Sequence, residues 1–246
     1  MTNDTQSATA LSPVVFLSLG PGDPELLTLK AVRLLKEADA VMVPGTINAE
    51  GHLMSRAADI IEPWCEKRKQ RLYGLPMERH RQAAMNVYDQ IYQEVVHFCQ
   101  LGMRVVVAVE GDVSIYASIH YVLDRLLTAG IPVEQVPGIP SFIAAASAAS
   151  LSLVSQHERL LVVPGDVDTD ELSRLLAHGH VVVVMKLSAC EEAVKAYIQR
   201  NKAVEYHYFE NVGTSKAFDT GDSDAILKRR FPYFSLLMLR ARRPVS

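Results

Sequence analysis

VVFLSLGPGDPELLTLKAVRLLKEADAVMVPG, residues 14–45, sets out a strand, a turn, a helix and a second strand. Its first six residues are an apolar run that stops at glycine, which is typical of a strand buried on both faces. A GPGDP turn follows, and apolar residues then recur at helical spacing over residues 25–38. A second strand over residues 40–43 ends at Pro44 and Gly45. This order of elements predicts a parallel α/β sheet.

The same alternation of strands and helices continues along the chain. The pattern predicts helices over residues 79–101, 115–129, 141–149, 171–177 and 191–199, and strands over residues 104–109, 133–136, 159–163, 181–185, 203–209 and 232–239. A polar stretch near residues 151–156 interrupts the series after an alanine-rich helix. We therefore expect two α/β domains, residues 1–152 and 153–246.

The bulk composition narrows the class of protein. The 246 residues are 49% hydrophobic and 22% charged, which is ordinary for a globular protein. A net charge of -3 argues weakly against a nucleic-acid partner. The three cysteines lie far apart and predict neither a zinc site nor disulfides, as in a reducing compartment. Without a signal sequence or an apolar run near ~18–20 residues, we expect a cytoplasmic protein, no membrane contact and no resident metal.

Four of the predicted strands end in turns rich in glycine or proline. These turns are residues 20–23, 110–112, 137–140 and 210–214. In open α/β sheets, ligands bind beyond the carboxyl ends of the strands, and glycine lets the backbone approach a ligand closely. A single such turn is commonplace, but four at matching strand ends indicate a ligand site.

The first turn differs from two better-known glycine motifs. Glu25 stands where the third glycine of a dinucleotide-binding GxGxxG would be, and no GK[ST] follows as in a phosphate-binding P-loop. The carboxylates of Asp23 and Glu25 would also repel a phosphate. The turn therefore favours a cationic or zwitterionic ligand such as S-adenosylmethionine, and a dinucleotide-binding protein is the weaker alternative.

Residues 20–45 resemble the N-terminal signature of the tetrapyrrole (corrin/porphyrin) methylases. Further segments match that family in the correct order: GDVSIY (111–116), VPGI (136–139), VVVVMK (181–186), ENVGTS (210–215) and PYFSLLMLR (232–240). The resemblance runs from about residue 14 to residue 240. On these motifs the chain is identified as a member of the family.

The resemblance implies two α/β domains with S-adenosylmethionine in the cleft between them, S-adenosylhomocysteine as a product, and a homodimer. Carried over position by position, it implies that the methyl donor is bound by Pro21, Gly111, Asp112, Val113, Ile115, Pro140, Ser141, Lys186 or Leu187, Gly213 and Thr214. Pro140 departs from the family pattern, because serine or threonine is common at that place.

Within the family, three segments resemble the branch that methylates precorrin-2 at carbon 20 in cobalamin biosynthesis. They are MVPGT (42–46), PSFIAAA (140–146) and PYFS (232–235). Pro44 stands where the branch that methylates uroporphyrinogen carries an aspartate. Another corrin-ring or uroporphyrinogen methylase, and a relative that methylates a protein or an RNA base, stay open as alternatives. Whether the substrate carries cobalt also stays open.

The chemistry predicts few catalytic residues. Carbon 20 of a reduced tetrapyrrole behaves like an enamine carbon, so proximity and orientation supply much of the catalysis, about 7–11 kcal/mol. Positioning is therefore expected to matter more than one indispensable base, and if a base takes the departing proton, Glu110, Asp112 and Tyr116 are the candidates by location. Asp112 has an alternative role, which is to bond amides of its own turn. For the substrate carboxylates we expect Arg79, His80 and Arg81, because arginine forks suit carboxylates.

Overall fold

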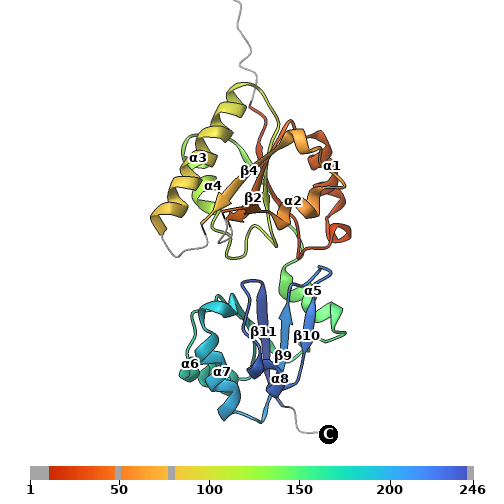
Figure 1. Cartoon of the computed structure of the whole chain (residues 1–246), viewed down its shortest axis with the longest axis vertical. Coiled ribbons are helices and arrows are strands. Elements are labelled where there is room, and N and C mark those ends of the chain that lie inside the picture. Colours follow the sequence, from red (N-terminus) through yellow and green to blue (C-terminus); the bar gives the residue numbers. More distant parts are fainter. Residues whose placement is uncertain (1–10, 48–50, 77–80, 243–246) are drawn as a thin grey trace, which may run out of the picture. The chain divides into compact units, whose positions relative to one another are not determined.

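The computed structural model describes residues 11–47, 51–76 and 81–242. It divides into two compact units, residues 1–139 and 140–246, and Figure 1 shows the elements of each. The sequence places the boundary later, between residues 152 and 153. The difference is the alanine-rich helix α5 (Ser141–Ala148), which the structure groups with the second unit.

A mostly parallel sheet forms the centre of the first unit. Its strands are β1 (Val14–Ser18), β2 (Ala40–Ile47), β3 (Leu53–Met54), β4 (Gln70–Leu75), β5 (Val105–Val109) and β6 (Val133–Val136). They follow the order β3-β2-β5-β1-β6, and β4 pairs with β2. Every pair is parallel except β2 with β3. The predicted parallel sheet is therefore confirmed here, with β3 and β4 as strands that the apolar pattern does not reveal.

Helices cover both faces of this sheet (Figure 1). The helices are α1 (Leu29–Glu37), α2 (Arg56–Ile61), α3 (Arg81–Gln100) and α4 (His120–Thr128), with 3-10 turns at Pro24–Leu26 and Lys67–Lys69. Phe16 and Val107 pack with α3 and α4, whereas Leu17 and Val106 pack with α1 and α2. Since alternate side chains are buried on opposite faces, β1 and β5 read as continuous apolar runs.

Two helices begin later than the sequence predicts. The helix predicted from residue 25 begins at Leu29, because Asp23 caps a separate 3-10 turn and the Thr28 hydroxyl accepts from the N–H of Ala31. The helix predicted from residue 115 begins at His120. The residues between β5 and α4 form a turn instead, which includes Tyr116 at a φ of 51°.

The second unit contains a mixed sheet. Its strands are β7 (Arg159–Val163), β8 (His180–Met185), β9 (Val204–Glu210), β10 (Phe218–Thr220) and β11 (Ser235–Ala241), in the order β10-β9-β11-β8-β7. Only β7 and β8 pair in parallel, and β11 runs antiparallel to both of its neighbours. The carboxyl ends of β7, β8 and β9 therefore lie at one edge of the sheet.

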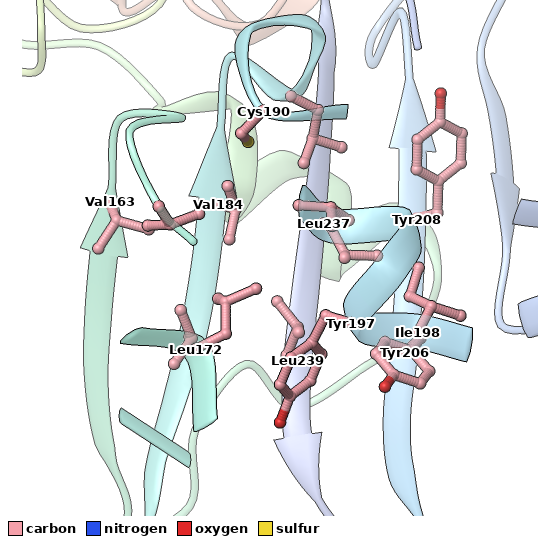
Figure 2. Close-up of a cluster of buried hydrophobic side chains, with 14 of the residues drawn as sticks. Val163, Leu172, Val184, Cys190, Tyr197, Ile198, Tyr206, Tyr208, Leu237 and Leu239 are labelled. Carbon is pink, nitrogen blue, oxygen red and sulfur yellow. The ribbon is translucent and has the colours of Figure 1, made fainter. Parts of the chain in front are cut away.

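One core cluster joins this sheet to three helices. Besides α5, the helices are α6 (Thr169–Ala177), α7 (Glu191–Arg200) and α8 (Ser223–Lys228), with a 3-10 turn at Leu187–Ala189. Figure 2 shows Leu172 of α6 and Ile198 of α7 beside strand residues that include Val184 and Leu237. Predicted α/β character is confirmed in this unit, but α8 and β10 are too short to show a clear periodic pattern.

Over the residues that the structure describes, no helix is both long and apolar enough to cross a membrane. The three cysteines are free thiols and all are buried.

Candidate functional site

The turns after β1, β5 and β6 are fastened together at the carboxyl edge of the first sheet. Gly20 and Gly111 form a reciprocal pair of backbone hydrogen bonds, 3.0 and 2.8 Å long. Gly138 packs against them so tightly that an added Cβ would lie 2.6 Å from Ser18 Cβ and 3.1 Å from the Gly111 oxygen. Three of the four turns expected from the sequence are thereby brought into one place.

Asp112 ties two of these turns to each other. One carboxylate oxygen accepts from the Gly138 N–H at 2.7 Å, and the other accepts from the N–H and the hydroxyl of Ser114. Burial raises the pKa of the Asp112 carboxyl, but the hydrogen bonds from Gly138 and Ser114 outweigh burial and lower it. The carboxylate is therefore held ionised as an acceptor for backbone amides, which makes it a weak base.

A buried serine fixes the next residue of the same turn. The Ser18 hydroxyl, which is 1% exposed, accepts from the N–H of Val113 at 2.9 Å. The Val113 side chain packs into the core beside α3 and α4, and its carbonyl contacts His120 Nε2 at 2.9 Å. The side chain of Val113, a predicted donor residue, is therefore part of the core, and hydrogen bonds within the protein fix its backbone.

Glu110 directly follows β5, and the charge of Arg56 acts on its carboxyl. Burial raises the pKa of the Glu110 carboxyl, whereas the Arg56 charge and the N–H of Ala57 lower it. Arg56 also donates a hydrogen bond to the carbonyl of Pro21. One arginine of α2 therefore bonds Pro21 and favours the ionised form of Glu110, and both of these residues are expected at the site.

The remaining residues of the central turn differ in exposure. The N–H of Ile115 bonds the Asp112 carbonyl at 3.1 Å, and its side chain is half-buried. Tyr116 is 41% exposed and adopts a positive φ that is uncommon for a bulky side chain. A Cβ built on Gly111 would meet no atom within 4 Å, so open space borders the turn at this glycine. The turn can admit a ligand against its backbone.

In the second unit, two of the predicted donor residues follow β8. Lys186 adopts a left-handed conformation with φ 55°, and Gly165 packs so closely against it that an added Cβ would lie 2.6 Å from the Lys186 oxygen. The Leu187 side chain is fully buried in the core cluster. Of this pair, only Lys186 has an exposed side chain.

The other predicted donor residues of the second unit lie in a turn and at a helix start. Thr214 folds back on its own turn, since its hydroxyl donates to the Asn211 carbonyl at 2.8 Å. Gly213 has a φ of 75°, and the turn is joined to the start of β11 by a bond from the Asn211 N–H to the Phe234 carbonyl. Pro140 and Ser141 are the N-cap and first residue of α5.

The predicted substrate-binding cluster is not placed. Arg79 and His80 lie outside the described residues, and Arg81 is the first residue of α3, with a side chain that is not described. In the described part of the chain, no group of three or more histidine, cysteine, aspartate or glutamate side chains could hold a metal ion.

Sequence reasoning gave no positioning role to several residues that organise this site. Ser18 and Ser114 hold the central turn, and Arg56 holds the first turn from 35 positions further along the chain. A lone serine within the apolar run VVFLSL is a signal that could have found Ser18. Arg56 gives no local signal, because its role depends on a contact far away in the sequence.

Comparison with known proteins assigns the fold and the family. The family model described as Tetrapyrrole (Corrin/Porphyrin) Methylases matches residues 13–218. The protein named "Precorrin-2 C(20)-methyltransferase" from Sinorhizobium sp is 28% identical over 251 residues, covering 95% of this chain and 97% of that protein. "Cobalamin biosynthesis protein CobIJ" from Mycobacterium tuberculosis (strain ATCC 25618 / H37Rv) is 30% identical over 235 residues, covering 91% of this chain. The chain spans only 45% of the length of that Mycobacterium protein.

Solved structures share the fold at low sequence identity. A cobalamin biosynthetic enzyme described as cobalt precorrin-4 methyltransferase superposes with a TM-score of 0.70 at 19% identity, covering 93% of this chain and 94% of that one. A uroporphyrin-III C-methyl transferase from Thermus thermophilus, complexed with S-adenyl homocysteine, gives a TM-score of 0.65 at 21% identity, covering 93% of this chain and 97% of that one.

Proposed function

The chain belongs to the tetrapyrrole (corrin/porphyrin) methylase family, and from this premise we propose that it transfers a methyl group from S-adenosylmethionine to carbon 20 of precorrin-2 or its cobalt complex. The reaction would belong to cobalamin biosynthesis and would release S-adenosylhomocysteine. The observation that carries the proposal is the joined set of turns after β1, β5 and β6 in a chain that matches this family over residues 13–218.

The turns of the first unit suit a methyl donor of this kind. The open space at Gly111 leaves room for a ligand against backbone groups. The carboxylates near the edge, which include Asp23 and Asp112, favour a cationic sulfonium over a phosphate. Pro21, Gly111, Asp112, Val113 and Ile115 would hold the donor from this unit. Pro140, Ser141, Lys186, Gly213 and Thr214 are the residues proposed from the second unit, and Leu187 could take part through its backbone.

The choice of carbon 20 rests on a relative that matches at nearly full length. The Sinorhizobium protein carries that activity in its name, and 97% of it is covered by the match. Pro44, in place of an aspartate, supports a corrin-type substrate over uroporphyrinogen. The second candidate is methylation of another corrin position, which is favoured by the fold match to a cobalt precorrin-4 methyltransferase.

The residues of the site support catalysis by positioning. When bound, S-adenosylmethionine supplies an electrophilic methyl group. Carbon 20 of the reduced tetrapyrrole provides the electron pair, and its proton must then leave. Asp112 is a poor acceptor for that proton, because both of its oxygens already accept hydrogen bonds and its pKa is lowered. Glu110 has a raised pKa but is paired with Arg56, and Tyr116 is exposed.

An anaerobic methyl-transfer assay tests the function. The full chain is incubated with labelled S-adenosylmethionine and with precorrin-2, with or without bound cobalt, and NMR locates the new methyl group. We expect transfer to carbon 20. Binding of S-adenosylhomocysteine without transfer to either form would contradict the substrate assignment, and later corrin intermediates would then be tested.

Kinetics of three variants test the need for a base. Glu110→Gln, Asp112→Asn and Tyr116→Phe each remove one proposed proton acceptor. Since positioning carries the reaction in this proposal, we expect no variant to lose the full factor of about 100–10,000 that general base catalysis contributes. A loss of that size at saturating donor, in one variant that still binds S-adenosylhomocysteine normally, would identify a dedicated base.

The proposal extends to the assembly and to the cell compartment. A homodimer is implied by the resemblance, and a cytoplasmic location is supported by the buried free thiols. Light scattering of the purified chain would give twice the monomer mass of 27.2 kDa if it is a dimer. The carboxylates of the substrate are proposed to meet Arg79, His80 and Arg81, which triple replacement by alanine would test through the KM for the tetrapyrrole.

A further inference from the structure

Two consecutive residues at the start of α2, Ser55 and Arg56, each bond a different strand or the turn that follows it. The Ser55 hydroxyl donates to the Pro44 carbonyl near the end of β2, at 2.5 Å. Arg56 donates to the Pro21 carbonyl in the turn after β1. Arg56 also acts on the residue after β5, because its charge and the N–H of Ala57 lower the pKa of the Glu110 carboxyl, which burial raises.

The chain is shaped for this close approach. A Cβ on Gly45 would lie 2.8 Å from the Met54 oxygen, 2.9 Å from Leu53 Cδ1 and 3.3 Å from Ser55 Cβ. Only glycine at this position lets the segment before α2 lie against β2. The Ser55 hydroxyl also accepts from the N–H of Ala58 at 3.0 Å and so caps the helix. Ser55 therefore attaches the start of α2 to β2, and this attachment places Arg56, the next residue.

The charges of Arg56 and Glu110 attract each other in a partly buried environment. Both side chains are only partly accessible to solvent, and burial disfavours the charge of each. Their mutual attraction offsets part of that cost, so removal of the Arg56 charge would make the ionised form of Glu110 less favourable. The exposed Arg33 differs, since it pairs with Glu37 within one turn of α1 at 3.1 Å.

We propose that Arg56 is a positioning residue for the methyl donor, which holds the Pro21 carbonyl directly and the end of β5 through Glu110. This inference rests on the proposed function, because it concerns the same donor site. Arg56 acts through the turns and not through contact with the reacting atoms. It follows that Glu110 serves the geometry of the donor turn rather than proton transfer.

Donor binding by the full chain tests this role, with variants Arg56→Gln and Arg56→Lys and the matched control Arg33→Gln. Calorimetry gives the Kd for S-adenosylhomocysteine, and steady-state assays give the KM for each substrate. Arg56→Gln is expected to weaken S-adenosylhomocysteine binding by roughly ten-fold, because one charge-assisted hydrogen bond and its paired charge are lost. Arg56→Lys keeps the charge and should recover part of the loss, while Arg33→Gln should bind as the wild type does.

A double-mutant cycle separates positioning from loss of structure. If Arg56 acts through Glu110, the affinity losses of Arg56→Gln and Glu110→Gln are non-additive in the double variant, and the KM for the tetrapyrrole stays near the wild-type value. Wild-type affinity in Arg56→Gln, or losses that add, would overturn the inference and leave the donor site standing. A wild-type chain that binds no S-adenosylhomocysteine would overturn the proposed function itself, and the inference with it.

Discussion

The carboxyl edges of the two sheets are both rich in glycine turns, yet they are held in different ways. In the first unit, ionised side chains hold the turns. Asp112 bonds one turn to another through Gly138, and Arg56 of α2 bonds Pro21 in the turn after β1. In the second unit, the turns after β7 and β8 fit by close backbone packing, and the turn after β9 is closed by its own threonine hydroxyl.

This difference has a physical consequence. A charge-assisted hydrogen bond contributes more than a neutral one and depends on the protonation of its acceptor. The geometry of the first edge therefore depends on a few charged side chains. The geometry of the second edge depends on the close fit of Gly165 and on the hydrogen bond within the turn after β9. Donor binding should accordingly be more sensitive to single substitutions and to acid at the first edge.

Gly138→Ala should have the largest effect. The new Cβ would lie 2.6 Å from Ser18 Cβ, inside a place fixed by backbone on the other sides. Such overpacking costs about 3 kcal/mol of the free energy of unfolding and would separate the joined turns. We expect chemical denaturation to show that loss, and calorimetry to show no measurable S-adenosylhomocysteine binding.

Two matched variants sharpen this result. Gly165→Ala makes an equally close contact in the second unit, and it should destabilise that unit while the first unit keeps its fold. Gly102→Ala has a positive φ but open space around it, and about 1 kcal/mol of backbone strain with unchanged binding is expected. Wild-type affinity in Gly138→Ala would show that the three turns need not be held together.

Asp112→Asn should have the next largest effect. The amide can present only one oxygen, so either Gly138 or Ser114 loses its acceptor. Because these bonds are charge-assisted, we expect a loss of about 2 kcal/mol in the free energy of unfolding and a weaker donor affinity. Equal stability of the variant and the wild type at pH 7 would contradict the role given to this carboxylate.

The difference in stability between the wild type and Asp112→Asn should also depend on pH. The pKa of Asp112 is lowered on folding, so its contribution to stability is fully present above the unfolded value, about 3.9. The contribution is lost as the pH falls through the folded pKa. The stability difference between wild type and Asp112→Asn should stay constant from about pH 8 to 5 and shrink below about pH 4. A difference that shrank near pH 7 would point to another group.

Thr214→Val should have the smallest effect of the series. It removes the bond from the Thr214 hydroxyl to the Asn211 carbonyl, which closes a turn that backbone bonds also hold. We expect a loss of about 1 kcal/mol in stability and a donor affinity within roughly five-fold of the wild type. A loss of affinity larger than that of Asp112→Asn would reverse the contrast between the two edges.

The sequence predicted those parts of the molecule in which neighbouring residues carry the signal. Apolar runs predicted β1, β5 and β8, and the glycine turns after β1 and β5 were found because they follow such runs directly. By contrast, α2 buries only Ala57, Ile60 and Ile61, which is too short a pattern to distinguish from a loop. The start of α4 was placed too early, because residues 115–119 belong to the turn that follows β5 and contain no glycine or proline to mark where that turn ends.

The contacts within the site could not be predicted, because they join distant positions. Ser18 bonds Val113 across 95 residues, and Asp112 bonds Gly138 across 26. Sequence pattern marks such residues as polar groups near strand ends but does not say which carboxylate meets which amide. At Leu187 the family resemblance predicts a residue of the donor site, whereas the fold buries its side chain in the core.

Glycine amide signals test most directly whether the joined turns form the donor site. The full chain contains 13 glycines, and labelling them with nitrogen-15 gives a spectrum that can be followed during titration with S-adenosylhomocysteine. We predict that Gly20, Gly111 and Gly138 shift together along one saturating curve, while Gly102 and Gly130, which precede β5 and β6, stay unchanged. Saturable binding that left Gly20, Gly111 and Gly138 unshifted would contradict this account of the site.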